Sequence, residues 1–156
     1  MPIITISRAS HSGGTMVAER LHELLGYPLM GDQVVAETAR RYGVSEEDLL
    51  RGLDMPANFF ERFTSRRQRY LLATQATLGD VFIGGNGIYH GFAGQFVFQG
   101  TCNVFKVRLV APMEDRVRSA MTIHNISRDQ AIRHLADVDQ RRAKWSRQMF
   151  GVDWNE

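Results

Sequence analysis

The sequence predicts one α/β domain in which helices cover a parallel sheet, and three observations lead to this fold class. The chain has 156 residues, the size of a single domain with a proper core. Hydrophobic residues make up 44% and charged residues 23%, as in ordinary globular proteins. Short apolar segments alternate with amphipathic helical patterns along the chain, as expected when helices connect parallel strands.

The first predicted strand covers residues 3–6, which are apolar and β-branched. It leads into a turn that contains Gly13 and Gly14. A helix follows and ends at Gly26, with a proline two residues beyond. Its expected inward face carries four residues, Val17, Leu21, Leu24 and Leu25.

The middle of the chain has further helical patterns, at 33–42 and again after Ser45. Asp48 stands three positions after Ser45, which resembles a capping box. Residues 54–56 interrupt the pattern, and a long helix is predicted for 59–78.

The last part of the chain begins with two glycine-punctuated apolar pieces, 81–83 and 88–90, and an alternating strand at 105–111. Pro112 opens the next predicted helix at a favoured early position. A second capping box, Ser127 with Gln130, starts a long helix. Eight residues are expected to face inward from these two helices, namely Val117, Ala120, Met121, Ala131, Leu135, Val138, Trp145 and Met149.

Charge and composition narrow the class of partners. The net charge is only +2, so the chain lacks the basic field of a typical nucleic-acid binder. Nearly all cations are arginines, the lysines being Lys106 and Lys144, which favours anion binding or reflects a GC-rich genome. Cys102 is the only cysteine, and the sequence shows neither a long apolar run nor a signal peptide. These features indicate a cytoplasmic protein without a membrane partner.

The loop at residues 7–15 follows the first strand, where open α/β sheets bind their ligands. Its glycines and the start of the next helix favour an anion such as a nucleotide phosphate. The loop departs from the phosphate-loop pattern G-x-x-x-x-G-K-[ST], because Arg8 replaces the first glycine and Gly14 replaces the lysine. A plain tight turn without a ligand remains an alternative.

Six segments in order resemble the cytidylate kinase-like family, whose members are phosphate-loop relatives of nucleoside monophosphate kinases. The likeness extends over essentially the whole chain. The segments are 5–8 with the glycine turn and 17–21, 54–56 with 62–64, 89–95, 107–116, 139–145, and 151–154.

The resemblance implies a P-loop kinase-like three-layer fold that binds ATP and Mg²⁺ and transfers a phosphoryl group to a CMP-type acceptor. Such transfer depends on positioning and on cations. The implied phosphate site comprises Arg8, Ser10, Ser12, Gly13, Gly14 and Thr15. Asp32 and Arg62 would lie toward the acceptor. Arg116, Arg141 and Arg142 would be the lid cations, with Asp139 able to orient Arg142 three positions away.

The departures from the family pattern predict low activity. Phe92 stands where many relatives carry an arginine, and the loop has no lysine. Relatives also usually continue with a further strand and helix after the segment at 151–154, so the chain is expected to be truncated or to lack that strand. A homodimer is expected to cover the resulting open edge.

Several other interpretations stay open. The domain could be a non-catalytic nucleotide-binding module, a scaffold whose turn binds nothing or, more remotely, an RNA-binding domain. The arginines between 62 and 69 could be a solvated helix face, and Asp139 with Arg142 an ordinary surface ion pair. No metal site is predicted, because His11 and His90 have no ligand-type partners at metal-binding spacing.

Overall fold

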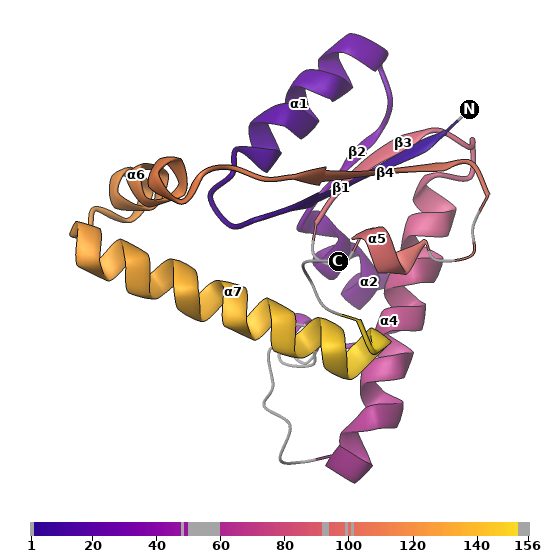
Figure 1. Ribbon diagram of the computed structural model, residues 1–156. Helices are drawn as coiled ribbons and strands as arrows, with labels where there is room; N and C mark the ends of the chain where they lie inside the picture. The colour runs from indigo at the N-terminus through magenta and orange to yellow at the C-terminus, as the bar shows by residue number, and fades with distance from the viewer. Residues whose placement is uncertain are drawn as a thin grey trace.

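The computed structural model describes residues 2–47, 49, 60–91, 94–98, 100 and 102–152, and for 60–67, 70, 148 and 149 it describes the backbone alone. Helices and strands alternate along the chain (Figure 1). Their bounds are β1 Ile3–Arg8, α1 Gly14–Leu25, β2 Leu29–Met30, α2 Gln33–Tyr42, α4 Phe60–Val81, β3 Gly87–His90, α5 Gly94–Val97, β4 Val104–Leu109, α6 Met113–His124 and α7 Arg128–Phe150.

The described strands form one parallel sheet in the order β2-β3-β1-β4. Strand β1 is central and pairs with β3 from Ile3↔Gly87 to Ile6↔His90 and with β4 on its other side. It is buried on both faces, which explains its continuous apolar run. The carboxyl ends of β1, β3 and β4 therefore lie at the same edge of the sheet.

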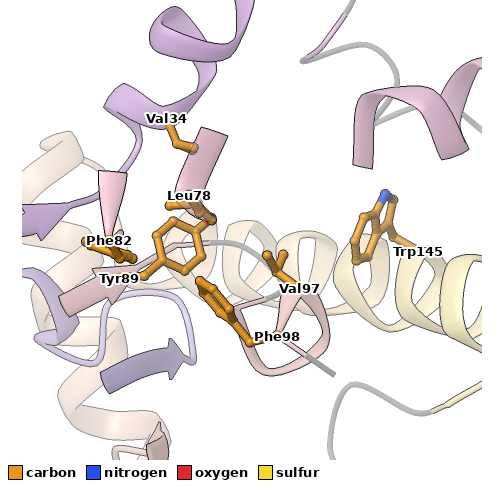
Figure 2. Close-up of a cluster of buried hydrophobic side chains, with 7 residues drawn as sticks. All are labelled: Val34, Leu78, Phe82, Tyr89, Val97, Phe98 and Trp145. Atoms are coloured by element: carbon orange, nitrogen blue, oxygen red, sulfur yellow. The ribbon is translucent and has the colours of Figure 1, made fainter. Parts of the chain in front are cut away.

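Helices cover both faces of the sheet, so the architecture has three layers (Figure 1). On one face Ile4, Ile6 and Ile88 pack with Ala18 of α1. On the other face α2, α4, α5 and the end of α7 enclose an aromatic-rich core (Figure 2). Its buried members are Val34, Leu78, Phe82, Tyr89, Val97, Phe98 and Trp145.

Helices α6 and α7 form a hairpin that extends beyond the sheet (Figure 1). Its interior is a separate small cluster of four buried residues, Val117, Ala120, Ala131 and Leu135. Ser127 caps α7: its hydroxyl accepts from the Gln130 N–H, and its own N–H donates to the Gln130 side chain. Helix α7 then runs back to the main core, where Trp145 is buried.

Most predicted elements are confirmed. Helix α2 has the predicted bounds, α6 starts directly after Pro112, and the capping box at Ser127 is formed. Strand β2 and helix α5 went unpredicted, because elements of two and four residues are too short to show a periodic pattern. The Ser45 capping box depends on Asp48, which lies outside the described residues, as do residues 54–56.

The inward face predicted for α1 was wrong, because three of its four residues, Leu25 included, are exposed. On α1, Val17 and Leu24 are exposed, and the buried positions are Gly14 and Ala18, because small residues let the helix lie close to the sheet. The strand predicted at 105–111 is β4, which ends at Leu109, and its Phe105 is exposed. The apolar piece at 81–83 is the end of α4 and the following turn. No described helix is both long and apolar enough to cross a membrane.

Candidate phosphate-binding site

The loop from Ala9 to Gly13 joins the central strand to α1 at the carboxyl edge of the sheet. Internal bonds fix its shape: the Ala9 N–H donates to the Leu109 carbonyl of β4 (3.1 Å), and the Ser12 hydroxyl donates to the Ala9 carbonyl (2.8 Å). Gly13 has φ 79°, a left-handed conformation that glycine adopts at little cost. The first-turn N–H groups of α1, which have no helical acceptor, therefore open toward the loop.

The side chain of Arg8 lies against Gly14. A Cβ built on Gly14 would stand 3.0 Å from Arg8 Cβ and 3.1 Å from Arg8 Cγ, and it would overlap Cδ. Position 14, where the phosphate-loop pattern has lysine, thus has no room for a side chain while Arg8 keeps this conformation. The aliphatic part of the half-buried Arg8 side chain fills that space, and the charge of Arg8 acts on His90 and Arg142.

Arg116 of α6 holds the loop in place. Its Nε donates to the Ser10 carbonyl and its Nη2 to the Ser10 hydroxyl, both at 2.8 Å. The same Nη2 donates to both carboxylate oxygens of Asp139 on α7, each at 2.8 Å. With Ser10 and Arg116 buried, these bonds join the loop to the α6–α7 hairpin.

Arg142 reaches the loop from α7 and donates from Nη1 to the Arg8 carbonyl at 2.9 Å. Burial is the main cause that lowers the pKa of Arg142, and the nearby charges of Arg8 and Arg116 add to it, whereas Asp139 and Asp32 act in the opposite direction. The mutually repelling charges of Arg8 and Arg142 are therefore held beside one loop, and this environment is favourable to an anion.

Asp32, at the start of α2, lies near the same edge of the sheet. Burial raises the pKa of Tyr89, and the charge of Asp32 adds to this effect. Burial lowers the pKa of His90, and there the charge of Asp32 acts in the opposite direction. The charge of Arg8 adds to the effect of burial on the pKa of His90. Arg8, Asp32 and His90 thus share the region beyond β1 and β3.

The other predicted site residues have different surroundings. Asp139 bonds Arg116 of another helix, a partner that the spacing to Arg142 did not suggest. Arg141 is exposed and pairs with Asp137 at 3.1 Å, apart from the arginines at the loop. Thr15 is exposed in the first turn of α1. The Arg62 side chain and Phe92 lie outside the described residues.

A histidine cluster beside the loop was missed by sequence reasoning. His11 of the loop has His124, at the end of α6, and His134, in α7, as neighbours. The Nε2 atoms of His11 and His124 are 3.4 Å apart. Burial and then the two neighbouring imidazoles lower the pKa of His11. Because its partners stand more than 110 positions away, local spacing could not indicate this cluster.

Comparisons with solved structures agree with the fold. An uncharacterised protein from Eubacterium ventriosum superposes with a TM-score of 0.74 at 14% identity, over 100% of this chain and 82% of that one. Shikimate kinase from Bacteroides thetaiotaomicron superposes with a TM-score of 0.53 at 13% identity, over 94% and 82%. No curated protein matches the sequence significantly.

The neighbours confirm the predicted fold class, a P-loop kinase-like fold with a parallel sheet and flanking helices. The family model matches residues 3–156, which confirms the resemblance drawn from the six segments and supports a kinase-like function. The chain belongs to the cytidylate kinase-like family.

Proposed function

We propose that the chain is an ATP-dependent phosphotransferase of the nucleoside monophosphate kinase type, with a CMP-type acceptor and low activity. The observation that carries this proposal is the pair of arginines beside a loop that has no lysine: the Arg8 side chain lies against Gly14, and its charge acts on the largely buried Arg142. Family membership supports the reaction class, and its cytidylate kinase-like character supports the choice of acceptor.

The residues around the loop fit ATP and Mg²⁺. The glycine turn and the start of α1 offer N–H donors to phosphate oxygens, and Arg8 and Arg142 offer positive charge from two sides. Mg²⁺ prefers oxygen ligands, and the exposed Thr15 hydroxyl stands at the serine/threonine position of the phosphate-loop pattern. When bound, Mg²⁺ supplies charge neutralisation at the phosphates.

The four arginines divide into different roles. Arg8 and Arg142 are the proposed catalytic cations, because both flank the loop. Arg116 acts through Ser10 and is a positioning residue, as is Asp139, which holds the Arg116 guanidinium. Arg141, paired with Asp137 on the solvent side of α7, lies outside this arrangement.

The acceptor side of the proposed site lies beyond β1 and β3. Asp32 contributes a carboxylate there, close enough to His90 and Arg142 to influence their pKa values. A carboxylate can accept hydrogen bonds from the exocyclic amine or hydroxyls of a nucleoside monophosphate. Arg62 is the second residue that we propose to bind the nucleoside monophosphate.

A combined binding and turnover assay tests the function. Thermal unfolding is followed with ATP–Mg²⁺, and product formation is measured with CMP, UMP, AMP and GMP. We expect ATP to raise the melting temperature, since a ligand of the native state stabilises it, and CMP to be converted slowly to CDP. Binding without turnover of any monophosphate would favour a non-catalytic nucleotide-binding module. No stabilisation by any nucleotide would refute both.

A further inference from the structure

Three imidazoles from three separate segments meet beside the phosphate loop. His11 comes from the loop itself, His124 from the last position of α6, and His134 from the second turn of α7. Each offers one ring nitrogen, and these three atoms all lie within 4.8 Å of one another. The rings meet edge to face or tilted, with centroids 4.9–5.7 Å apart.

This spacing suits a shared metal ion. Imidazole nitrogens bind Zn²⁺ at about 2.0–2.1 Å, so two such ligands of a tetrahedral site stand about 3.3–3.4 Å apart. The Nε2 atoms of His11 and His124 are 3.4 Å apart. His134 completes the set after a small side-chain adjustment, because its ligand atom is already within 4.8 Å of the other two.

The backbone supports the same arrangement. His11 has φ 59°, a left-handed conformation that is uncommon for a residue other than glycine. His124 follows the buried Ala120 by four positions, and His134 follows the buried Ala131 by three. One turn of helix separates each histidine from the hairpin interior, so both stand on the sides of α6 and α7 that face one another.

We propose that His11, His124 and His134 form a binding site for a divalent transition metal ion of the Zn²⁺ type. Three protein ligands leave the fourth tetrahedral position open to water or to an anionic oxygen. Three neutral imidazoles suit Zn²⁺, Co²⁺, Ni²⁺ or Cu²⁺, whereas Mg²⁺ and Ca²⁺ select oxygen ligands. This ion is therefore distinct from the Mg²⁺ of the proposed phosphoryl transfer.

The consequence of such an ion is a cross-link between three segments. The loop and the hairpin are already joined through Arg116 and Arg142, and the ion adds a bond from the loop to each helix. Metal binding would hold the lid helices on the loop whether or not a nucleotide is bound. The proposal thus does not depend on the kinase activity, and its test uses no nucleotide.

The test uses the full chain without an affinity tag, stripped of metal with a chelator. Zn²⁺ is titrated against a chromogenic competitor, and Co²⁺ is added separately to record its visible spectrum. The variants are His124→Ala, His134→Ala and the larger, neutral His134→Gln, and His22→Ala is the control. His22 is exposed on α1, bonds the Tyr27 carbonyl and lies outside the cluster. Circular dichroism of each apo variant verifies its fold.

We expect the parent to bind one Zn²⁺ and to give the intense visible bands of tetrahedral Co²⁺. Each cluster variant should bind Zn²⁺ at least about 10- to 100-fold more weakly, because even the loss of a group that only hydrogen-bonds to a metal ligand has an effect of this size. The control variant should bind Zn²⁺ as tightly as the parent. Equal affinity in the parent and in folded His124→Ala or His134→Gln would overturn the proposal, as would a parent that binds no Zn²⁺.

Discussion

The side chain of Arg8 occupies the space that a side chain on Gly14 would need. In the sequence, these two positions are separate departures from the phosphate-loop pattern, which has a glycine at its start and a lysine near its end. In space they are one exchange: the absence of a side chain at 14 leaves room for the aliphatic part of the arginine side chain at 8.

Gly14→Ala tests this exchange. The new methyl group overlaps Arg8, so we expect Arg8 to be displaced and ATP affinity to fall about tenfold or more, the equivalent of one charge-assisted hydrogen bond at about 1.5–3 kcal/mol. Isothermal titration measures the affinity. Gly79→Ala, on α4 with open space around it, is the control and should leave binding unchanged. Unchanged affinity in Gly14→Ala would show that Arg8 does not contact the phosphates.

Arg116→Ala should destabilise the fold by roughly 2–4 kcal/mol, because it leaves the Ser10 carbonyl without this donor and the carboxylate of Asp139 without its guanidinium partner. Arg116→Lys should recover only part of that loss, since an ammonium group cannot reproduce the guanidinium fork. Urea unfolding measures both. The control Arg118→Ala removes an exposed pair on the same helix and should change stability by about 0.5 kcal/mol or less. Equal effects at 116 and 118 would contradict the positioning role.

Arg142→Ala should remove detectable phosphoryl transfer while nucleotide binding survives at weakened affinity. Loss of one donor to the transition state costs about 3–4 kcal/mol, or two to three decades in rate. Steady-state kinetics and titration separate turnover from binding. Lys144→Ala, on the exposed part of α7, serves as the control. Turnover at the parental rate in Arg142→Ala would exclude Arg142 as a catalytic cation.

The buried His90 should make stability depend on pH. Because burial lowers its pKa in the folded state, the unfolded chain binds more protons as the pH falls through the ordinary value near 6.5. The contribution of neutral His90 to the free energy of unfolding is therefore complete above about pH 6.5. Below that pH the free energy of unfolding falls, by up to about 1.4 kcal/mol per pH unit. His90→Gln should reduce the slope of the urea-unfolding profile between pH 7.5 and 5, and the slope that remains includes the contribution of His11, whose pKa burial also lowers. A parental slope in His90→Gln would contradict this.

We also propose that the chain forms a homodimer along β4. Among the described residues β4 pairs only with β1, and Phe105 on it is 63% exposed. Unpaired strand edges with apolar side chains favour association. Light scattering should show a dimer that Phe105→Glu disrupts. Ile83→Glu, which changes an exposed residue after α4, should leave it intact. A parent that stays monomeric at high concentration would contradict the proposal.

Local signals in the sequence were sufficient for most of the fold. The bounds of α2 and the start of α7 follow from periodicity and from the reciprocal bonds of Ser127 with Gln130, all of which act within a few residues. The face that α1 buries could not be predicted in this way. Leu24 fits the apolar stripe better than Ala18, but the distance between helix and sheet favours the smaller residue.

The candidate site was predicted as a set of residues and not as a set of contacts. The loop and Arg142 came from the glycine turn and from the family resemblance. The bond from Arg116 to Asp139, the contact of Arg8 with Gly14 and the meeting of His11 with His124 depend on how the hairpin folds back. Such long-range contacts leave no periodic trace in one sequence.

Helix α7 belongs to two apolar clusters at once, with Leu135 in the hairpin and Trp145 in the main core. At about 1.5 Å per residue, its 23 residues form a rod of about 34 Å with no break among them. A tilt of the hairpin toward an occupied loop must therefore move the indole of Trp145 against the core residues that other segments contribute, Val97 and Phe98 among them. Trp145 is one of two tryptophans, so in a Trp154→Phe background its fluorescence becomes an optical signal of what the distant loop holds.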